Sequence, residues 1–198
     1  MNIEQGNKEF LNNLNINKEL KDRRDELVKG QHPKTLVITC SDSRVIPEFI
    51  FNCSLGDIFV IRTAGNVINE GELATVEYAI EHLKVKRIIV LGHTHCGAVH
   101  AAIHNEKGRY LDPILNRIKT NIGNTCDELE ASKINAGKEV SYLKEKFPHY
   151  EGTIEYKIYD IKTSIVYWLL SFSLSGIWNE PSNGNGLWHL GHVLIVFK

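Results

Sequence analysis

Three short runs of apolar, largely β-branched residues place the strongest constraint on the fold of this chain. They occupy residues 35–39, 57–62 and 87–91. Continuous runs of this kind suit strands that are buried on both faces, as in a parallel sheet. Between the second and third runs, apolar residues recur at helical spacing over 72–84. The order strand, helix, strand predicts a right-handed crossover.

Further elements extend this pattern in both directions. Helices are predicted at 112–122 and 127–146, and a hairpin at 153–160 with 164–168. Residues 4–29 favour helix and carry a narrow apolar stripe, which predicts an N-terminal helical arm that packs on something. The expected fold class is α/β, with a mostly parallel central sheet flanked by helices and one antiparallel edge.

Composition excludes several classes of protein. The 198 residues carry a formal net charge of −1, which gives no electrostatic reason to expect nucleic acid or an anionic membrane as a partner. Residues 1–9 lack the apolar core of a secretory signal, which favours a cytoplasmic protein. The longest uncharged stretch, 163–179, is too short for the roughly twenty apolar residues that span a bilayer, so no membrane span is expected.

Two cysteines and one histidine are expected to meet at one edge of the sheet. Cys40 follows the first strand, and His93 and Cys96 follow the third. In a parallel sheet these positions share the carboxyl edge, where open α/β sheets bind ligands. Cysteines in a chain that is not exported point to a metal or to free thiols. Cys53 and Cys126 stand apart from the others and are interpreted as packing residues.

Two thiolates and one imidazole suit zinc and leave its fourth position for water. His95 competes with His93, but its backbone loop to Cys96 is too short for comfortable chelation, so we favour His93. Asp42 is a second competitor, because in an extended segment it shares a face with Cys40. Arg44 shares that face too and can hold the Asp42 carboxylate away from the metal. An ordinary ion pair at a strand end is the alternative interpretation of Asp42 and Arg44.

These residues resemble the β-class carbonic anhydrases. The likeness rests on Cys40-x-Asp42-x-Arg44, His93-x-x-Cys96-Gly97, Arg62-Thr-Ala-Gly-Asn66 and Glu77-Tyr78-Ala79, which follow one another at family-like separations. It runs from Gln31 to Ala102 and more weakly to Thr163. The resemblance implies a β-carbonic anhydrase fold, one zinc ion per subunit, and the reversible hydration of carbon dioxide to bicarbonate and a proton.

The resemblance also implies a substrate pocket. Gln31, Phe59 and Tyr78 match pocket residues of the plant-like subgroup, and His82 matches its suggested proton-transfer histidine. Without the resemblance, Phe59 in a strand and Tyr78 in a helix suit core packing. A second subgroup closes its zinc with the aspartate and carries a tryptophan three residues before the first cysteine. Val37 stands there in this chain, which favours the open form.

The implied mechanism uses a zinc-bound hydroxide, because zinc lowers the pKa of bound water from about 15.7 towards neutrality. Asp42, fixed by Arg44, would orient the hydroxide, and His82 would export the proton. If Arg44 releases Asp42, the carboxylate becomes the fourth ligand, an exchange that low pH favours. Two alternative functions remain: hydrolysis of carbon disulfide or carbonyl sulfide on the same scaffold, and a non-catalytic zinc-stabilised interaction module.

The expected organisation has three parts. Residues 1–30 form the arm, 31–168 the zinc-binding catalytic domain, and 169–198 an apolar extension that belongs to the same domain or to an oligomer contact. His189 and His192 in this extension are interpreted as incidental, since a third ligand is missing. The resemblance implies a homodimer or a dimer of dimers (a homotetramer), with the cleft built across the subunit interface.

Overall fold

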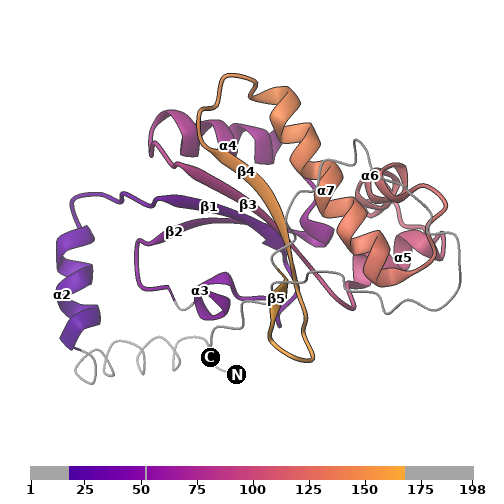
Figure 1. Cartoon of the computed structure of the whole chain (residues 1–198), viewed down its shortest axis with the longest axis horizontal. Helices are drawn as coiled ribbons and strands as arrows, with labels where there is room; N and C mark the ends of the chain where they lie inside the picture. The colour runs from indigo at the N-terminus through magenta and orange to yellow at the C-terminus, as the bar shows by residue number, and fades with distance from the viewer. Residues whose placement is uncertain (1–17, 52, 168–198) are drawn as a thin grey trace, which may run out of the picture.

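The computed structural model describes residues 18–51 and 53–167, and a five-stranded sheet runs through them (Figure 1). The strands are β1 (Thr35–Cys40), β2 (Ile58–Thr63), β3 (Arg87–His93), β4 (Thr153–Tyr159) and β5 (Val166–Tyr167). Their order is β2-β1-β3-β4-β5, with the first four parallel and β5 antiparallel to β4. The predicted α/β class, the mostly parallel sheet and its antiparallel edge are confirmed.

Both faces of β1 are buried because side chains of successive residues point to opposite faces and each face is covered. Leu36 and Ile38 join the core under α4 (Glu70–Glu81) and α7 (Glu128–Lys146). Val37 belongs to a separate core on the other face, which α3 (Pro47–Ile50) helps to cover. Figure 1 shows α4 and α7 on one side of the sheet and α3 on the other. Full burial explains the continuous apolar run.

Helix α4 begins two residues before the predicted 72–84 segment and ends earlier. Asn69 occupies the N-cap position, and its backbone N–H donates to the Glu72 carboxylate at 2.9 Å, as in a capping box. His82 is the C-cap, and Lys84 has a left-handed φ of 55°. The predicted segment began at Glu72, which is the third residue of the helix, and it continued the apolar period three residues past the end of the helix at Glu81.

Helices α5 (Gly97–Ile103) and α6 (Asp112–Ile122) lie beyond the carboxyl ends of the strands, and α7 runs from beside them along one face of the sheet (Figure 1). Helix α6 has its predicted bounds, and α7 begins one residue late because Asp127 caps it, accepting from the Glu130 N–H at 2.7 Å. Helix α5 lies in a segment for which no helix was predicted. All three contribute to a core that also contains Cys40 and Cys96.

Helix α2 (Lys18–Leu27) is the described part of the predicted arm and lies at the side of the molecule away from α5 and α6 (Figure 1). Arg23 ties it to the body, donating to the Asp57 carboxylate at 2.7 Å and to the Leu55 carbonyl at 3.1 Å. Residues 1–17 and the extension from 168, with His189 and His192, lie outside the described residues.

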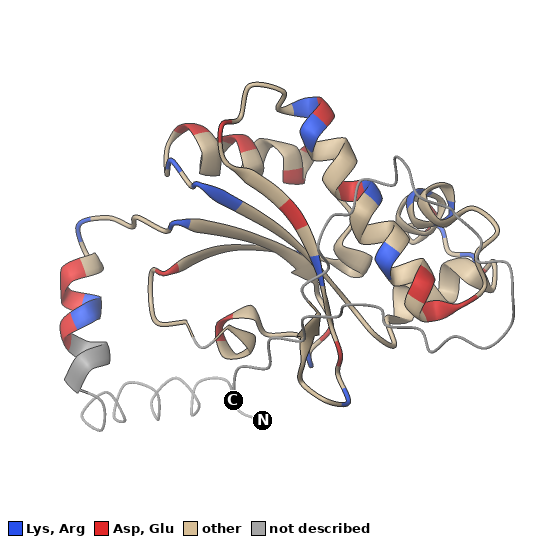
Figure 2. Ribbon diagram, in the orientation of Figure 1, with Lys and Arg blue, Asp and Glu red and all other residues tan. Residues whose placement is uncertain are grey.

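Charge and exposure refine two expectations. Figure 2 shows basic and acidic residues interspersed along α2 and α7, so neither helix carries charge of one sign. Cys126 is exposed in the loop before α7, so its interpretation as a packing residue is wrong, whereas Cys53 is half-buried. Within the described residues, every helix is too short or too polar to cross a membrane.

Candidate metal centre

Cys40, His93 and Cys96 come together at the carboxyl edge of the sheet. Cys40 is the last residue of β1, His93 the last of β3, and Cys96 the N-cap of α5. Because β1 and β3 pair in parallel, both strand ends reach the same edge. One ligand atom from each residue lies within 4.8 Å of the other two, and the two sulfurs are 4.0 Å apart. The residues are 5%, 1% and 3% exposed.

The His93 ring is held in the orientation that a metal ligand requires. Its Nδ1 donates to the Thr94 carbonyl at 2.9 Å, which leaves Nε2 as the atom with a free lone pair. Nε2 is buried and has no hydrogen-bond partner among the residues that the structure describes. A buried acceptor without a partner is costly, and a cation bound at Nε2 would remove that cost.

The two thiols lie in contact and shift each other's pKa in opposite directions. A hydrogen bond from Cys96 lowers the pKa of Cys40, and the same contact, together with burial, raises the pKa of Cys96. These opposite shifts favour a state in which the pair holds a single proton, placed between the two sulfurs. A divalent metal that replaces this proton binds both sulfurs as thiolates, the form that zinc requires. The donor set fits zinc.

Asp42 and Arg44 form a clamped ion pair beside this group. The Arg44 guanidinium donates through Nε to Oδ1 at 2.9 Å and through Nη2 to Oδ2 at 2.7 Å, and the Arg44 backbone N–H adds a bond of 2.9 Å to Oδ1. The Asp42 side chain is 15% exposed and that of Arg44 52%. The hydrogen bonds from Arg44 lower the pKa of Asp42 to about 2, so the carboxylate is ionised at ordinary pH.

The structure separates the two histidines that competed in the sequence. His95 is exposed, has a left-handed φ of 55°, and lies outside the group of three. Its carbonyl accepts from Arg44 Nη2 at 3.2 Å. His95 therefore supports the Asp42–Arg44 pair through its backbone carbonyl and is not one of the three candidate ligands.

Two neighbours of the site were not predicted. Arg62 donates to the carbonyls of Cys40, at 3.3 Å, and Asp42, at 2.8 Å, which fixes the loop that carries them. The Gly65 N–H donates to the Cys40 sulfur at 3.3 Å. Both belong to the Arg62-Thr-Ala-Gly-Asn66 segment, so a signal was present, but the sequence did not show what these residues contact.

The predicted pocket residues do not lie at the metal centre of the same chain. Phe59 is opposite Leu36 in the register of β1 and β2, which places it about 13 Å along the strand from Cys40. Tyr78 and His82 accompany Phe59: the Phe59 and Tyr78 rings are 6.1 Å apart, and Tyr78 stacks on His82 at 5.1 Å.

Gln31 lies still further away, because it precedes the whole of β1, a strand of about 17 Å. It is exposed, and Tyr78 is 44% exposed. The parallel register explains the separation, because Cys40 ends β1 at the carboxyl edge while the start of β1 and the residues paired with it lie at the amino edge. Within one chain, the predicted pocket residues therefore lie apart from the metal centre.

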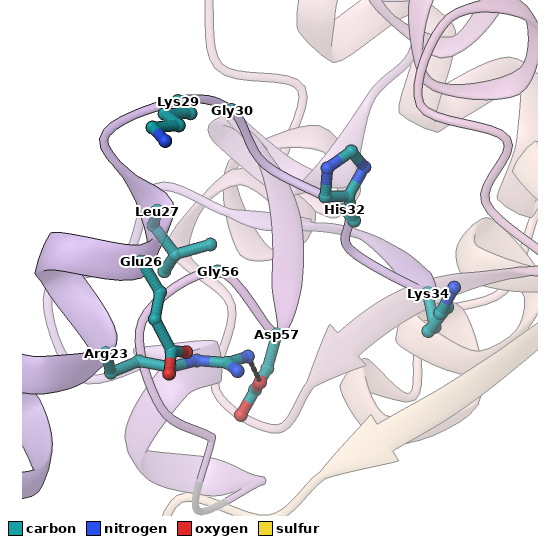
Figure 3. A pocket seen from close by; sticks show the side chains of 9 residues that line it. All are labelled: Arg23, Glu26, Leu27, Lys29, Gly30, His32, Lys34, Gly56 and Asp57. Atoms are coloured by element: carbon teal, nitrogen blue, oxygen red, sulfur yellow. Dashed lines mark hydrogen bonds and ion pairs between the residues drawn. The ribbon is translucent and has the colours of Figure 1, made fainter.

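A cavity of about 450 Å³ lies at the amino edge, where α2 meets the body (Figure 3). Figure 3 shows the Arg23–Asp57 ion pair on one side of it and His32 and Lys34 on the other. Of the predicted site residues, none lines it. The cavity marks the place where α2 contacts the body mainly through Arg23 and Leu27, and it is separate from the metal centre.

The protein is of the α/β class, with a mostly parallel sheet. At the carboxyl edge of this sheet, two buried cysteines and one histidine form a candidate three-ligand metal centre. A family model described as carbonic anhydrase matches residues 35–165. The solved β-carbonic anhydrase CcaA is similar over 84% of this chain and 87% of its own, with a TM-score of 0.70 and 30% sequence identity. The chain belongs to the β-class carbonic anhydrase family.

Other relatives agree with this assignment. A carbonic anhydrase from Synechococcus elongatus is 49% identical over 81 residues, which is 38% of this chain and 30% of the relative. Carbonic anhydrase 2 from Mycobacterium tuberculosis is 51% identical over 82 residues, 41% of this chain and 40% of the relative. The chain thus spans less than half the length of these curated relatives.

A tetrameric β-carbonic anhydrase from Sordaria macrospora is similar in structure, with a TM-score of 0.65 and 26% identity. It covers 83% of this chain and 93% of its own.

Proposed function

We propose that this protein is a zinc enzyme that catalyses the reversible hydration of carbon dioxide to bicarbonate and a proton. The observation that carries the proposal is the buried group of Cys40, His93 and Cys96, in which His93 Nε2 has no partner among the described residues. The ionised, Arg44-clamped Asp42 next to it in the chain adds the acceptor that such a reaction needs.

Cys40, His93 and Cys96 would hold one zinc ion per subunit. When bound, zinc lowers the pKa of a coordinated water towards neutrality and so supplies a hydroxide nucleophile at ordinary pH. The chain contributes burial, which excludes competing water, and the Nδ1 contact of His93 with the Thr94 carbonyl, which keeps Nε2 directed inward. The Gly65 N–H supports the charge on the Cys40 sulfur.

Asp42 would position the nucleophile. A carboxylate only accepts hydrogen bonds, and each of its oxygens has two lone pairs. Arg44 donates to both oxygens and thereby fixes the plane of the group, while lone pairs remain to accept a hydrogen from the attacking oxygen. This clamp supports the open form of the site, because Asp42 must leave Arg44 before it can become a fourth ligand.

The pocket wall would come from a second copy of the chain. Phe59 and Tyr78 lie at the amino edge, far from Cys40, and Tyr78 exposes much of its ring. An apolar wall suits a nonpolar gas, and a two-fold axis placed between the two edges would bring the amino edge of one copy to the carboxyl edge of the other. Gln31 and His82 would accompany this wall, Gln31 as a donor to substrate and His82 as a proton acceptor.

The thiols support a reducing compartment such as the cytoplasm. All four cysteines, including the exposed Cys126, are free. Exported proteins usually pair exposed cysteines or lack them, whereas free thiolates at Cys40 and Cys96 are needed for metal binding.

Stopped-flow hydration of carbon dioxide by the zinc-loaded protein tests the proposal. We expect Asp42→Asn to keep its zinc and to lose activity about a hundredfold, because the amide cannot act as an acceptor-only partner. Asp57→Asn is the matched control, since Asp57 is also held by an arginine but lies at the amino edge. The assay is run beside carbonyl sulfide. Zinc-loaded protein that hydrolyses the sulfide but does not hydrate carbon dioxide would contradict the proposal.

A further inference from the structure

A buried polar network joins α6 to α7 behind the metal centre. Arg117 and Asn121 lie on α6, and Asn135 and Glu139 lie on α7. We call these four residues the α6–α7 network. Each pair is four residues apart and therefore shares one helix face, and the two faces meet. Asn135 and Glu139 are fully buried. Apolar side chains are the usual filling between packed helices, so this network requires an explanation.

The hydrogen bonds of the network have a fixed donor-to-acceptor order, which is set by the Arg117 guanidinium. Arg117 donates to both Glu139 oxygens, through Nε at 2.9 Å and Nη2 at 3.2 Å, so both oxygens act as acceptors in the network. Asn121 must then present its Nδ2 group, which donates to Glu139 Oε1 at 2.8 Å and to Asn135 Oδ1 at 2.9 Å. The Asn135 amide consequently turns its own Nδ2 the other way.

The free end of the network contacts the backbone beside a metal ligand. Asn135 Nδ2 donates to the Gly65 carbonyl at 2.9 Å, and the Gly65 N–H donates to the Cys40 sulfur at 3.3 Å. Gly65 has a left-handed backbone, with φ 65° and ψ 20°. A Cβ atom there would lie 2.7 Å from the Ile118 side chain. Gly65 is therefore held on its carbonyl side by Asn135 and against α6 by packing.

We propose that the α6–α7 network positions the metal centre: Asn135 holds the carbonyl of Gly65, and the left-handed backbone of this residue, fixed by that bond and by packing on Ile118, keeps its N–H pointed at the Cys40 sulfur. The bond lowers the electron density on a thiolate that zinc would share, and it fixes the direction from which Cys40 approaches the ion. Asn135 is a positioning residue, because it touches neither ligand atom nor substrate. The inference rests on the zinc site of the proposed function and is independent of the reaction.

Zinc affinity tests this role directly. Zinc-loaded protein is challenged with a chromophoric chelator of known affinity. We expect Asn135→Ala to bind zinc 10- to 100-fold more weakly, the range found when a group that orients a metal ligand is removed. Ser132→Ala is the matched control: Ser132 is also buried on α7, and its Oγ has no hydrogen-bond partner among the described residues. Its affinity should stay within about twofold of the parent.

A second variant and a spectrum separate positioning from loss of folding. Asn121→Ala changes a half-buried residue and leaves Asn135 in place but free to turn, so its zinc affinity should fall less than that of Asn135→Ala. In cobalt-substituted protein, the thiolate-to-metal charge-transfer band should move to longer wavelength in both variants, because a sulfur without its N–H donor is more easily oxidised.

Wild-type zinc affinity and an unmoved band in Asn121→Ala would overturn the inference, even if Asn135→Ala does not fold. The proposed function fails separately: it fails if the parent protein binds zinc and does not hydrate carbon dioxide, a result that leaves this inference standing.

Discussion

The two edges of the sheet differ in how complete they are. At the carboxyl edge, one chain gathers Cys40, His93 and Cys96 in a buried group, in which Gly65 donates to the Cys40 sulfur and the Thr94 carbonyl accepts from His93. At the amino edge, Phe59 and Tyr78 contact each other but leave much of the Tyr78 ring exposed. The ends of β1 and β3 and the start of α5 build the first site within one chain, whereas the second has an exposed side.

The contrast shows which contacts one copy of this fold supplies. The carboxyl ends of parallel strands converge whatever surrounds them, so metal ligands placed there need no partner. Residues at the start of the same strands are separated from that edge by the length of the strand. They reach a reacting centre only if another copy is rotated against the first.

The largest effect is expected from breaking the carboxyl edge. Cys40→Ser replaces a thiolate ligand with a hydroxyl that zinc binds poorly, so zinc should be lost and hydration should fall at least about a thousandfold. Metal analysis and stopped-flow hydration measure both. The exposed Cys126→Ser serves as the control and should match the parent. Retention of zinc and rate by Cys40→Ser would show that the ligand set is wrong.

A smaller effect at the same edge is expected from Arg44→Lys. Lysine keeps the charge but cannot make the paired contacts from Nε and Nη2 to the two Asp42 oxygens. Zinc should remain, and hydration should fall roughly 10- to 100-fold. The control is Arg109→Lys, which changes an arginine that lies over the exposed Tyr110 ring. Equal rates for the two variants would reduce the Asp42–Arg44 pair to an ordinary ion pair.

Tyr78→Ala at the amino edge tests whether the wall comes from another copy. It should keep zinc and lose about tenfold in hydration, because the substrate is less well placed. A heterodimer of Cys40→Ser and Tyr78→Ala chains, purified with two affinity tags, then contains one site with intact ligands and an intact wall. Its activity should be about half that of the parent dimer.

A wall supplied by the same chain predicts a different result for that heterodimer, about a twentieth of parent activity. Sedimentation of an active, stable monomer would also contradict the shared wall.

The smallest functional effect is expected between the edges, at Glu155. Burial alone would raise its pKa, but hydrogen bonds from Lys157 and Arg87 lower it below the usual 4.5. Ionised Glu155 therefore stabilises the fold above the unfolded-state pKa, and this stabilisation disappears as the pH falls through the folded-state pKa. Lys157 is 4% exposed, so weakening its ion pair with Glu155 is costly.

Glu155→Gln should lower the free energy of unfolding by roughly 2 kcal/mol at neutral pH. The difference from the parent should shrink at an acid pH below the folded-state pKa of Glu155. Urea titrations at both pH values measure this, while zinc content and hydration rate stay unchanged. A loss of zinc would show that the metal centre depends on the stability of the whole sheet.

Sequence patterns located the strands well because buried parallel strands are continuous apolar runs. Residues 35–39 and 87–91 were predicted on that basis, and β1 and β3 extend them by one and two residues to include Cys40 and His93. Helix ends were less accurate, since the cap at Asn69 and the left-handed Lys84 depend on side-chain contacts and backbone angles that periodicity does not encode.

Other features had no usable pattern. Helix α5 is short and rich in alanine, with no polar face long enough to give a period. The contacts of Arg62 with the Cys40 loop, and of Asn135 with Gly65, join residues far apart in the chain. Such contacts can be identified only once the strands and helices have been packed against one another.

The sequence by itself determined the α/β class, the order of the parallel strands along the chain and the residues at the ends of β1 and β3. Continuous apolar runs indicate strands that are buried on both faces, and the alternation of strand and helix indicates that these strands are parallel. Only the tertiary structure decided that His93 points inward while His95 does not, that Arg44 holds both Asp42 oxygens, and that Phe59 lies a strand's length from Cys40. These are distances between segments, and they follow from register and packing, which no local pattern contains.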